Sequence, residues 1–530
     1  MTGTVIVSTW GKPSGWRKAS YIVEVPRRRD IELKECGWFK STLGALVSAF
    51  PGSFLVVFVA DTLADSMSPM ECEDYDCVRE LASKYARQYL EAEEYVPPRQ
   101  RVELRVSPGC GAYRNLVVRG GPALFALNVY LYVLEKLREY RPETIVLDVS
   151  HGVNYMPLYA YYAVKRAATV YVLERGVELS LLVYNSDPVL KDGQTSILHL
   201  VERRDLKWRE VLPEAYSEVE LATVNLKDLV NRTVKVPALP ESEGGKKSEL
   251  GRMVRQLREF LSRELTVLDV KELFEKSVRV VKAARRGLIL CLAYDLAEGV
   301  VGADKVRSYE ELLFKLLERA VGLGRMDEQL VIYHYVWSGD LLYRIHTGLV
   351  VGSALRRVLE GREPPFLLAD LWRVHDELIV DEAASMIVKH ELGEYENYVR
   401  AFAVLSRLLG IEVEDREIPY KVVYDTIAGG EFPELKEISR ESSRAEIAGK
   451  IGGFIEWLGA ERRERLRHAV SQLLKELEGV RDIHVDPRNF YAHAGMERNI
   501  TAVKFRFTDE GVKVLIKYID PEKAREIAYR

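Results

Sequence analysis

The first two hundred residues alternate short apolar, β-branched runs with longer stretches in which apolar residues recur at helical spacing. This alternation is typical of a parallel β-sheet whose strands are joined by crossover helices. Several of the runs are apolar throughout, so we expect the centre of the sheet to be covered on both faces. The predicted strands are Thr4–Thr9, Phe54–Ala60, Val102–Val106, Thr144–Val149, Thr169–Leu173 and Leu181–Tyr184. The predicted helices are Glu73–Glu91, Pro122–Tyr140 and Val153–Ala167.

The second half of the chain has a different pattern, in which long segments with helical periodicity dominate. The predicted helices there are Met253–Leu265, Val267–Glu298, Tyr309–Ala320, Ile387–Leu409 and Ala460–Leu477. One β signal returns near the end, where apolar residues alternate on both sides of Thr508-Asp509-Glu510-Gly511. This pattern predicts a terminal β-hairpin. The predicted fold class is therefore α/β plus all-α, with a Rossmann-like parallel sheet first and a helical part second.

A stretch rich in proline, glycine, serine and lysine, Val234–Leu250, lies between the two patterns. Such a composition favours an exposed connection. We therefore expect an N-terminal domain over residues 1–200, a connecting region over residues 201–250 and a helical domain over residues 251–530.

Composition limits the class of protein. Apolar residues make up 47% and charged residues 29%, which is typical of a globular protein. The net charge of −4 argues against non-specific coating of nucleic acid, although a local basic groove is compatible with it. The five cysteines include only one loosely spaced pair, Cys72 and Cys77, so all five are expected to be reduced thiols. Without a signal peptide or a long apolar run, the chain is expected to be soluble and cytoplasmic, with no membrane partner.

Polar and glycine residues follow three of the predicted strands. In a parallel sheet, loops at the carboxyl ends of the strands meet, and free backbone amides gather there. We therefore expect a ligand site at this edge of the sheet. Its candidate residues are Thr9, Trp10, Gly11, Asp61, Thr62, Ser150, His151, Gly152, Val153 and Asn154.

The last of these segments, Leu147–Asn154, runs from a buried strand through a glycine turn into a helix. Its hydroxyl, amide and backbone N–H groups suit an anionic or nucleotide-like ligand. The alternative is that Ser150 caps the helix and His151 is a hydrogen-bonded loop histidine. Gly109-Cys110-Gly111 does not open a helix, so a conventional nicotinamide site is not expected.

The segment from Asp486 to Gly495 predicts a helix start, with Asp486 as N-cap and Pro487 at the first helical position. Asn489 and His493 then share one helix face, whereas Arg488 points well away from the histidine. If Arg488 and His493 serve one site, a bent helix end or a partner subunit must bring them together.

An arginine and a histidine suit metal-free RNA cleavage, in which a 2′-hydroxyl attacks its neighbouring phosphate. Histidine moves protons near neutral pH, and arginine holds phosphate. The bare spacing is weak evidence, because about one match is expected by chance. Arg463 and His468 give a second match within a charge-laced helix. His484 and His493, with Asp482 and Asp486, match no standard ligand pattern, so no metal site is expected.

Two motifs resemble known families. The Ser150-His151-Gly152-x-Asn154 loop, with Thr9-Trp10-Gly11 and the later Tyr184–Pro188 segment, resembles CARF domains, the sensors of type III CRISPR ancillary proteins. The segment Arg488-Asn489-Phe490-Tyr491-Ala492-His493 resembles the catalytic motif of HEPN ribonucleases. A CARF domain followed by a HEPN domain implies an endoribonuclease of antiviral defence that a cyclic oligoadenylate activates.

The resemblance also implies site residues and partners. Arg488, His493 and Asn489 would cleave single-stranded RNA without a metal, and no cofactor is expected besides the activator. The family implies a homodimer or a higher homo-oligomer, with the activator on its two-fold axis. Two other functions stay open on the sequence: a CARF-type transcriptional regulator and a non-catalytic helical binding module. The first would favour a basic recognition helix, and the chain has no clear one.

Overall fold

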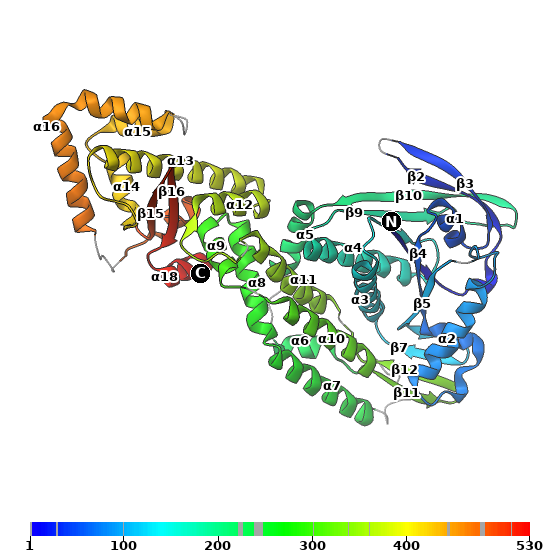
Figure 1. Cartoon of the computed structure of the whole chain (residues 1–530). Helices are drawn as coiled ribbons and strands as arrows, with labels where there is room; N and C mark the ends of the chain where they lie inside the picture. Colours follow the sequence, from blue (N-terminus) through cyan, green and yellow to red (C-terminus); the bar gives the residue numbers. More distant parts are fainter. Residues whose placement is uncertain are drawn as a thin grey trace. The chain divides into compact units, whose positions relative to one another are not determined.

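The computed structural model describes residues 3–27, 30–98, 100–220, 226–237, 247–299, 301–337, 339–359, 361–441, 446–477, 483–509 and 511–530. The chain forms two compact units (Figure 1). Unit 1 comprises residues 1–274 and 303–351, and unit 2 comprises residues 275–302 and 352–530. This division differs from the one expected at residues 201–250, because two segments of the predicted helical half belong to unit 1.

Unit 1 is built on an eight-stranded sheet of order β3-β2-β10-β9-β8-β1-β4-β5. Five neighbouring strands of this sheet, β9, β8, β1, β4 and β5, run parallel to one another, which confirms the predicted α/β architecture. Every residue of β4 is buried, as expected of a central strand covered on both faces. The strands are β1 (Thr4–Trp10), β2 (Ala19–Pro26), β3 (Ile31–Phe39), β4 (Phe54–Ala60), β5 (Val102–Ser107), β8 (Thr144–Asp148), β9 (Leu179–Ser186) and β10 (Gln194–Leu206).

Helices cover both faces of this sheet. The core on one face includes residues of α1 (Thr42–Ala49) and α2 (Tyr75–Leu90). On the other face, α3 (Pro122–Tyr140) and α4 (Tyr155–Arg175) pack side by side against the strands (Figure 1). The sheet is followed by α5 (Trp208–Glu220).

The predicted strand Thr169–Leu173 is wrong, because these residues form the last turns of α4. All five are buried in the helix, which continues to the left-handed Gly176. An apolar β-branched run does not by itself distinguish a buried strand from a buried helix, and burial against the sheet outweighs the weak propensity here.

A second, four-stranded sheet of order β11-β12-β7-β6 completes unit 1. Strand β12 (Gln329–His334) pairs in parallel with β7 (Leu116–Arg119), far away in the sequence. This pairing ties residues 303–351 to the N-terminal part of the chain. The remaining helices and strands are β6 (Gly111–Ala112), β11 (Val321–Met326), α6 (Leu226–Thr233), α7 (Lys247–Val267) and α10 (Ala303–Arg319); α11 (Asp340–Leu355) begins in unit 1 and ends in unit 2.

The expected connecting region, residues 201–250, is not free of regular structure. It contains the end of β10, all of α5 and α6, and the start of α7. Residues 221–225 and 238–246, which include most of the stretch rich in proline and glycine, lie outside the described residues.

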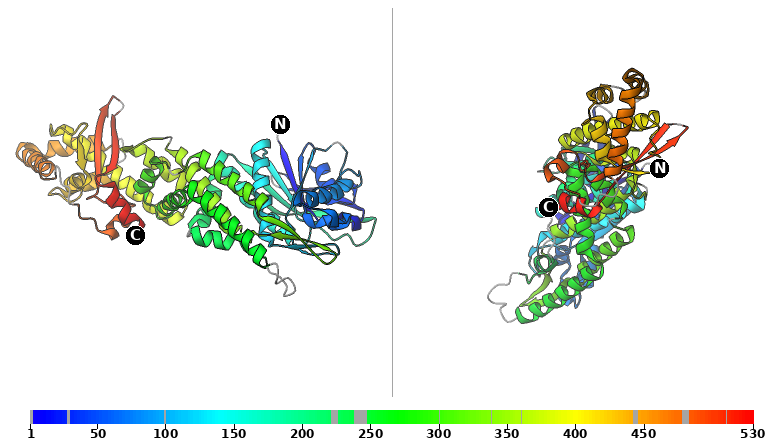
Figure 2. Two further views of the ribbon diagram at one scale, coloured as in Figure 1. Left: turned by 90° about the horizontal axis from the view of Figure 1, so that it is seen from below. Right: turned by 90° about the vertical axis from the view of Figure 1, so that its left-hand side faces the viewer.

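Unit 2 is mainly helical and ends in the predicted hairpin, which is confirmed. Strands β15 (Thr501–Thr508) and β16 (Gly511–Tyr518) pair antiparallel and lead into α18 (Pro521–Tyr529), drawn in red in Figure 2. They belong to a sheet of order β13-β16-β15-β14. The other elements are α9 (Ile289–Ala297), α12 (Leu368–Leu378), β13 (Phe366–Leu367), α13 (Glu382–Leu408), β14 (Glu417–Pro419), α14 (Tyr420–Ile427), α15 (Pro433–Glu441), α16 (Ile447–Glu476) and α17 (Pro487–Ala492); α8 (Val270–Arg285) begins in unit 1 and ends in unit 2.

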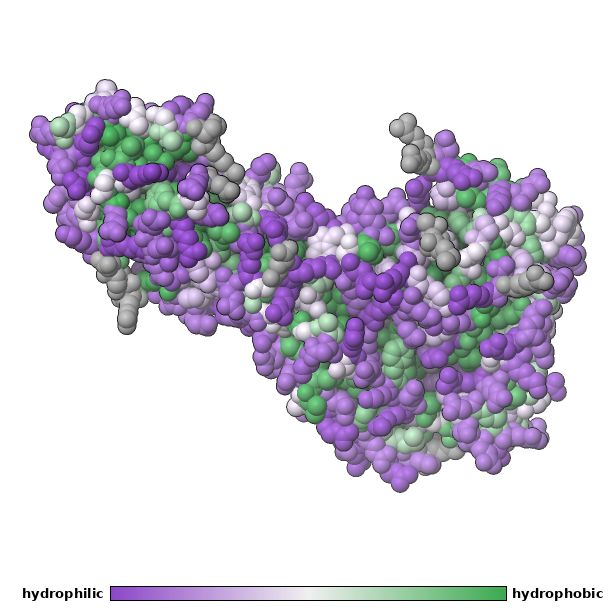
Figure 3. Space-filling model, in the orientation of Figure 1, coloured by the Kyte–Doolittle hydropathy of each residue, from purple (hydrophilic) through white to green (hydrophobic). Residues whose placement is uncertain are grey.

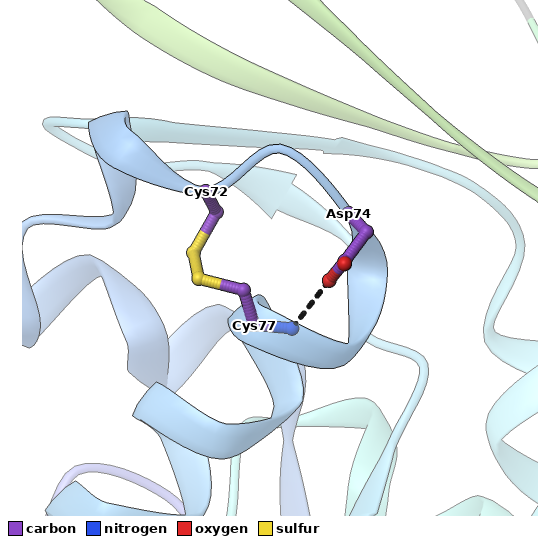
Figure 4. Close-up of a disulfide and its surroundings, with 3 residues drawn as sticks. All are labelled: Cys72, Asp74 and Cys77. Atoms are coloured by element: carbon purple, nitrogen blue, oxygen red, sulfur yellow. Dashed lines mark hydrogen bonds between the residues drawn. A yellow bond between two sulfur atoms is a disulfide. The ribbon is translucent and has the colours of Figure 1, made fainter.

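A disulfide joins Cys72 to Cys77 at the start of α2 (Figure 4). The expectation that all five cysteines are reduced thiols is therefore wrong for these two. Asp74 lies inside the ring and caps the helix by accepting the backbone N–H of Cys77 at 2.8 Å. This turn brings the two Cα atoms to 5.5 Å, within the range that a disulfide spans, which their spacing in the sequence did not indicate.

The surface is mostly hydrophilic in the view of Figure 3, with hydrophobic residues gathered in separate patches. Across the described ranges, no helix combines the length and the apolar character that crossing a membrane requires.

Candidate functional site

The loops that follow β1 and β8 lie against each other, as the topology predicts. The Thr9 hydroxyl donates to the backbone carbonyl of His151 at 2.6 Å. Gly11 packs so closely on Gly152 that a Cβ at residue 11 would lie 3.3 Å from the Gly152 carbonyl carbon. Gly152 itself has a φ of +129°, which favours glycine. The structure thus brings the predicted residues after these two strands into one cluster.

Asp148, the last residue of β8, holds this cluster together. Its fully buried carboxylate accepts hydrogen bonds from the hydroxyls of Ser8 at 2.9 Å and Thr42 at 2.7 Å. It also accepts the backbone N–H of Ser150 at 3.0 Å. A buried carboxylate needs such donors, so Asp148 fixes the path of the loop after β8. Sequence analysis did not select it, because its partners come from distant segments.

The side chains of His151 and Trp10 belong to one aromatic cluster, in which both contact Trp16. The imidazole stacks on Trp16 with ring centroids 4.0 Å apart, and Trp16 contacts the fully buried Trp10. Burial lowers the pKa of His151, which favours its neutral form. Its Nε2 can then accept the backbone N–H of Thr42 at 3.4 Å.

Ser150 and Asn154 occupy different parts of the loop. The Ser150 hydroxyl accepts the backbone N–H of Ser186, at the end of β9, at 3.0 Å. Ser150 does not cap α4, because Asn154 occupies the N-cap position, without a side-chain capping bond. Asn154 is exposed, and Val153 beside it is half-buried.

Asp61 and Thr62, after β4, are buried. The Asp61 carboxylate accepts the backbone N–H of Gly109 at 2.8 Å and the Tyr75 hydroxyl at 2.9 Å. It also lies 2.9 Å from Nε2 of His334, on β12. Asp61 therefore ties the second sheet of unit 1 to the end of β4, in a network of its own.

In unit 2, α17 begins as the sequence predicts. The Asp486 side chain accepts the backbone N–H of Arg488 at 2.8 Å, and Pro487 is the first helical residue. The helix ends after Ala492, and His493 is its C-cap. Within this turn the backbone N–H of His493 donates to the Asn489 carbonyl at 2.9 Å, so the two residues lie one above the other.

Asn489 and His493 both open into a pocket of about 180 Å³, which we call the His493 pocket. Its walls come from α13, α14, α17 and the chain after α17. The other lining residues are Glu391, Glu394, Tyr395, Tyr398, Tyr420, Tyr424, Met496, Glu497 and Arg498.

Glu391 of α13 lies 2.8 Å from Nδ1 of His493. An ionised carboxylate only accepts, so Nδ1 carries the proton of this hydrogen bond and Nε2 stays available to a substrate. The hydrogen bond to Glu391 raises the pKa of His493, and the partial burial of the ring opposes this. The pair therefore favours an imidazole that is charged over a wider pH range than a free histidine.

Arg488 and Arg498 lie differently with respect to this pocket. Arg488 is exposed and does not belong to the described lining. Arg498 does line it, and its guanidinium lies 4.9 Å from the centre of the Tyr424 ring. Sequence analysis missed both Glu391 and Arg498, because neither belongs to the motif that singled out His493.

Among the residues that the structure describes, no group of three or more His, Cys, Asp or Glu side chains is arranged to hold a metal ion. Asp482, considered in the sequence as a ligand, lies outside the described residues. His484 is exposed, one position after the buried Ile483.

Two family models match the chain. Residues 5–188 match the CARF domain of the CRISPR system endoribonuclease Csx1, and residues 381–522 match the HEPN domain of the same family. The first range contains the loops after β1 and β8. The second range contains α13, α14 and α17, which carry the His493 pocket.

One curated relative agrees with these matches. A CRISPR system endoribonuclease Csx1 from Methanocaldococcus jannaschii is 27% identical over 423 residues, covering 77% of this chain and 79% of its own. A solved structure of Enterococcus italicus Csm6 bound to cyclic hexa-2′-fluoro-hexa-dAMP is 10% identical. The match covers 99% of both chains and has a TM-score of 0.23. Since both domain models match in order and together span most of the chain, it belongs to the CARF–HEPN family of CRISPR system endoribonucleases.

Proposed function

We propose that the chain cleaves single-stranded RNA without a metal, with His493 as the proton-transfer group, when a cyclic oligoadenylate occupies the loops after β1 and β8. The observation that carries the catalytic part is the hydrogen bond between Glu391 and Nδ1 of His493. It presents Nε2 to the substrate and supports the charged form of the ring.

The proposed reaction is an internal transphosphorylation. A ribose 2′-oxygen loses its proton to a base and attacks the adjacent phosphorus, and the bond from phosphorus to the 5′-oxygen breaks. The leaving 5′-oxygen takes a proton from an acid. A neutral His493 is a suitable base, and a protonated His493 is a suitable acid. The products are a 2′,3′-cyclic phosphate and a 5′-hydroxyl, so atoms and charge balance without a metal or an oxidant.

We further propose that the active enzyme is a homodimer. Arg488 is exposed and lies outside the described lining of the His493 pocket of its own subunit. In a dimer with a two-fold axis, the α17 helices of the two subunits can lie side by side. The Arg488 side chains of both subunits can then face the same stretch of RNA backbone. In this arrangement Arg488 binds the phosphate, and the Asn489 amide donates a hydrogen bond to the substrate.

The sensing part rests on the cluster at the ends of β1 and β8. The proposed ligand contacts are made by the backbone of Gly11, Gly152 and Val153 and by the side chains of Ser150 and Asn154. Asn154 is exposed at the N-terminus of α4, where helix N–H groups favour an anionic ligand. Asp148 and His151 act behind them and keep the loop in place.

The test is cleavage of end-labelled single-stranded RNA by the purified protein, with and without a panel of cyclic oligoadenylates of different ring size. Each reaction is run in EDTA and in Mg²⁺. We expect cleavage only with an activator, equal rates in both buffers, and products that end in a 2′,3′-cyclic phosphate. Activity that is lost in EDTA and restored by a divalent ion would contradict the metal-free mechanism.

A further inference from the structure

One side of the His493 pocket is a cluster of four tyrosines. The rings of Tyr395 and Tyr420 stack with centroids 4.0 Å apart, and both are buried. Tyr398 meets Tyr424 edge to face at 6.1 Å. Tyr424 is only half-buried and lies next to Arg498. Aromatic rings and arginine planes of this kind are surfaces on which nucleic acid bases stack.

The pocket carries charged groups of both signs. Glu391, Glu394 and Glu497 line it, against Arg498 and the His493 ring. Each of these carboxylates is held in place: Glu391 by His493, Glu394 by Arg440 at 2.6 Å, and Glu497 by Asn499. Glu391 faces the His493 ring, Glu394 faces Arg440, and burial raises the pKa of Glu497, so the charges around the pocket largely offset one another.

Such a pocket has no net charge that favours an anion, and its carboxylates offer acceptors to a neutral base with an amino group. A carboxylate accepts several hydrogen bonds, so one that already holds an arginine or a histidine can accept another from an amino group. Carboxylates select cytosine by this contact in nucleic acid recognition. The volume of about 180 Å³ exceeds that of several water molecules, each of which takes about 30 Å³ in the liquid.

We propose that the His493 pocket holds a base next to the scissile phosphate, and that Glu394 selects bases that carry an exocyclic amino group. Tyr424 and Arg498 provide the stacking surface. The proposal rests on the proposed ribonuclease function and adds its substrate preference. At the exocyclic position of the Watson–Crick edge, adenine and cytosine carry the amino donor, whereas hypoxanthine and uracil carry a carbonyl that a carboxylate cannot hydrogen-bond and keep only the ring N–H beside it as a donor.

The test uses RNA oligonucleotides with a single cleavable linkage, the other riboses being 2′-O-methylated. The base beside that linkage is adenine, hypoxanthine, cytosine or uracil, placed on the 5′ side in one series and on the 3′ side in the other. In one of the two series, the one whose base enters the pocket, we expect kcat/KM to be about tenfold higher for adenine than for hypoxanthine. The same difference is expected there between cytosine and uracil. This comparison uses the wild-type protein, with the most effective activator.

Variants then assign the preference to the pocket. Glu394→Gln replaces an acceptor by an amide, so it should remove or invert the preference. The matched control, Glu382→Gln, changes an exposed residue in the first turn of the same helix and should keep it. Tyr424→Ala should lower kcat/KM for all four bases by about tenfold, because stacking does not depend on the base. Tyr424→Phe keeps the ring and should behave like the wild type.

The outcomes separate the two proposals. Equal cleavage of all four bases in both series would overturn the base pocket and leave the ribonuclease function standing. A preference that Glu394→Gln leaves unchanged, in a variant with a wild-type circular dichroism spectrum, would also overturn it. If the wild type cleaves none of the RNAs with any activator, both proposals fail together.

Discussion

The loops after β8 and the end of α17 each carry a histidine, but their surroundings differ. His151 in unit 1 stacks on Trp16, and burial lowers its pKa. His493 in unit 2 meets the carboxylate of Glu391, and this hydrogen bond raises its pKa. The first environment suits a neutral ring that accepts a backbone hydrogen bond. The second suits a ring that gains and loses protons near neutral pH. The surroundings of the same side chain therefore suit a structural role in unit 1 and the proton transfer that we propose in unit 2.

The two regions also differ in how their parts come together. In unit 1 the loops follow neighbouring parallel strands, so any chain with this topology brings them to one edge. In unit 2 the partner of His493 comes from α13, a hundred residues earlier, and only the packing of helices places it there. The contrast indicates that a sheet edge can be predicted from strand order, whereas a pocket between helices depends on tertiary contacts.

The largest expected effect comes from removing the proposed proton-transfer group, His493. His493→Ala should lower the rate of RNA cleavage by about 100- to 10 000-fold. The variant lacks the imidazole that we propose as the base for the 2′-hydroxyl and as the acid for the leaving 5′-oxygen. Binding of the cyclic oligoadenylate, measured by isothermal titration calorimetry, should be unchanged. The matched control is His468→Ala, which changes the histidine of the second Arg-x-x-x-x-His match, on the exposed side of α16. Loss of ligand binding in His493→Ala would contradict the separation of the two roles.

The reciprocal change removes proposed ligand contacts from the loop after β8. Ser150→Ala together with Asn154→Ala removes two hydrogen-bonding groups, each with an expected contribution of about 1 kcal/mol. The activator concentration for half-maximal cleavage should then rise by about 30-fold. The rate at saturating activator should change little, because a ligand shifts a switch only through its difference in affinity for the two states. A wild-type activation curve in this variant would remove these residues from the ligand site.

A smaller effect is expected at the partner of His493. Glu391→Gln removes the negative charge, so the pKa of His493 should fall toward that of a free histidine. The acid form is then lost at lower pH, and both limbs of the bell-shaped profile of kcat should move to lower pH. The rate at the optimum should fall by about tenfold, as is common for the outer partner of a functional histidine. The pKa itself can be followed by NMR titration of the His493 ring, and an unchanged profile would exclude this positioning role.

The smallest effect on activity is expected at the disulfide. Replacing Cys72 and Cys77 by serine opens a short ring and should lower the free energy of unfolding of unit 1 by about 2 kcal/mol. Cleavage at saturating activator should be unaffected, because neither cysteine belongs to the loops or to the pocket. Thermal unfolding in the presence and absence of reductant measures the change in stability. Equal stability of the variant and the wild type would show that the bridge does not stabilise the fold.

Much of the fold could be predicted from the pattern of apolar positions. Strand β4 and helix α3 have the predicted bounds, and the terminal hairpin lies where alternation indicated it. The errors occur where local pattern is ambiguous. The β-branched run at the end of α4 fits a strand as well as a buried helix, and only its position against the sheet made it helical.

The observed division into two units also differs from the domain boundary expected from the sequence, for another reason. The sequence changes character near residue 250, but residues 303–351 belong to unit 1 because β12 adds to a sheet that begins with β6 and β7. Pairing between segments so far apart leaves no periodic trace in either of them. The same holds for Cys72 and Cys77, whose bridge follows from the turn that precedes α2.

By itself the sequence determined the order of an α/β and a helical part, the loop with Ser150 and Asn154, and the helix start at Asp486 that places Asn489 and His493 on one face. These features depend on local periodicity, capping and strand order, which short stretches of chain encode. Only the tertiary structure decided that Asp148 anchors the loop after β8, that Glu391 holds His493, and that Arg498 rather than Arg488 lines the pocket. Those choices depend on hydrogen bonds and packing between distant segments, which form only when the folded core fixes their positions.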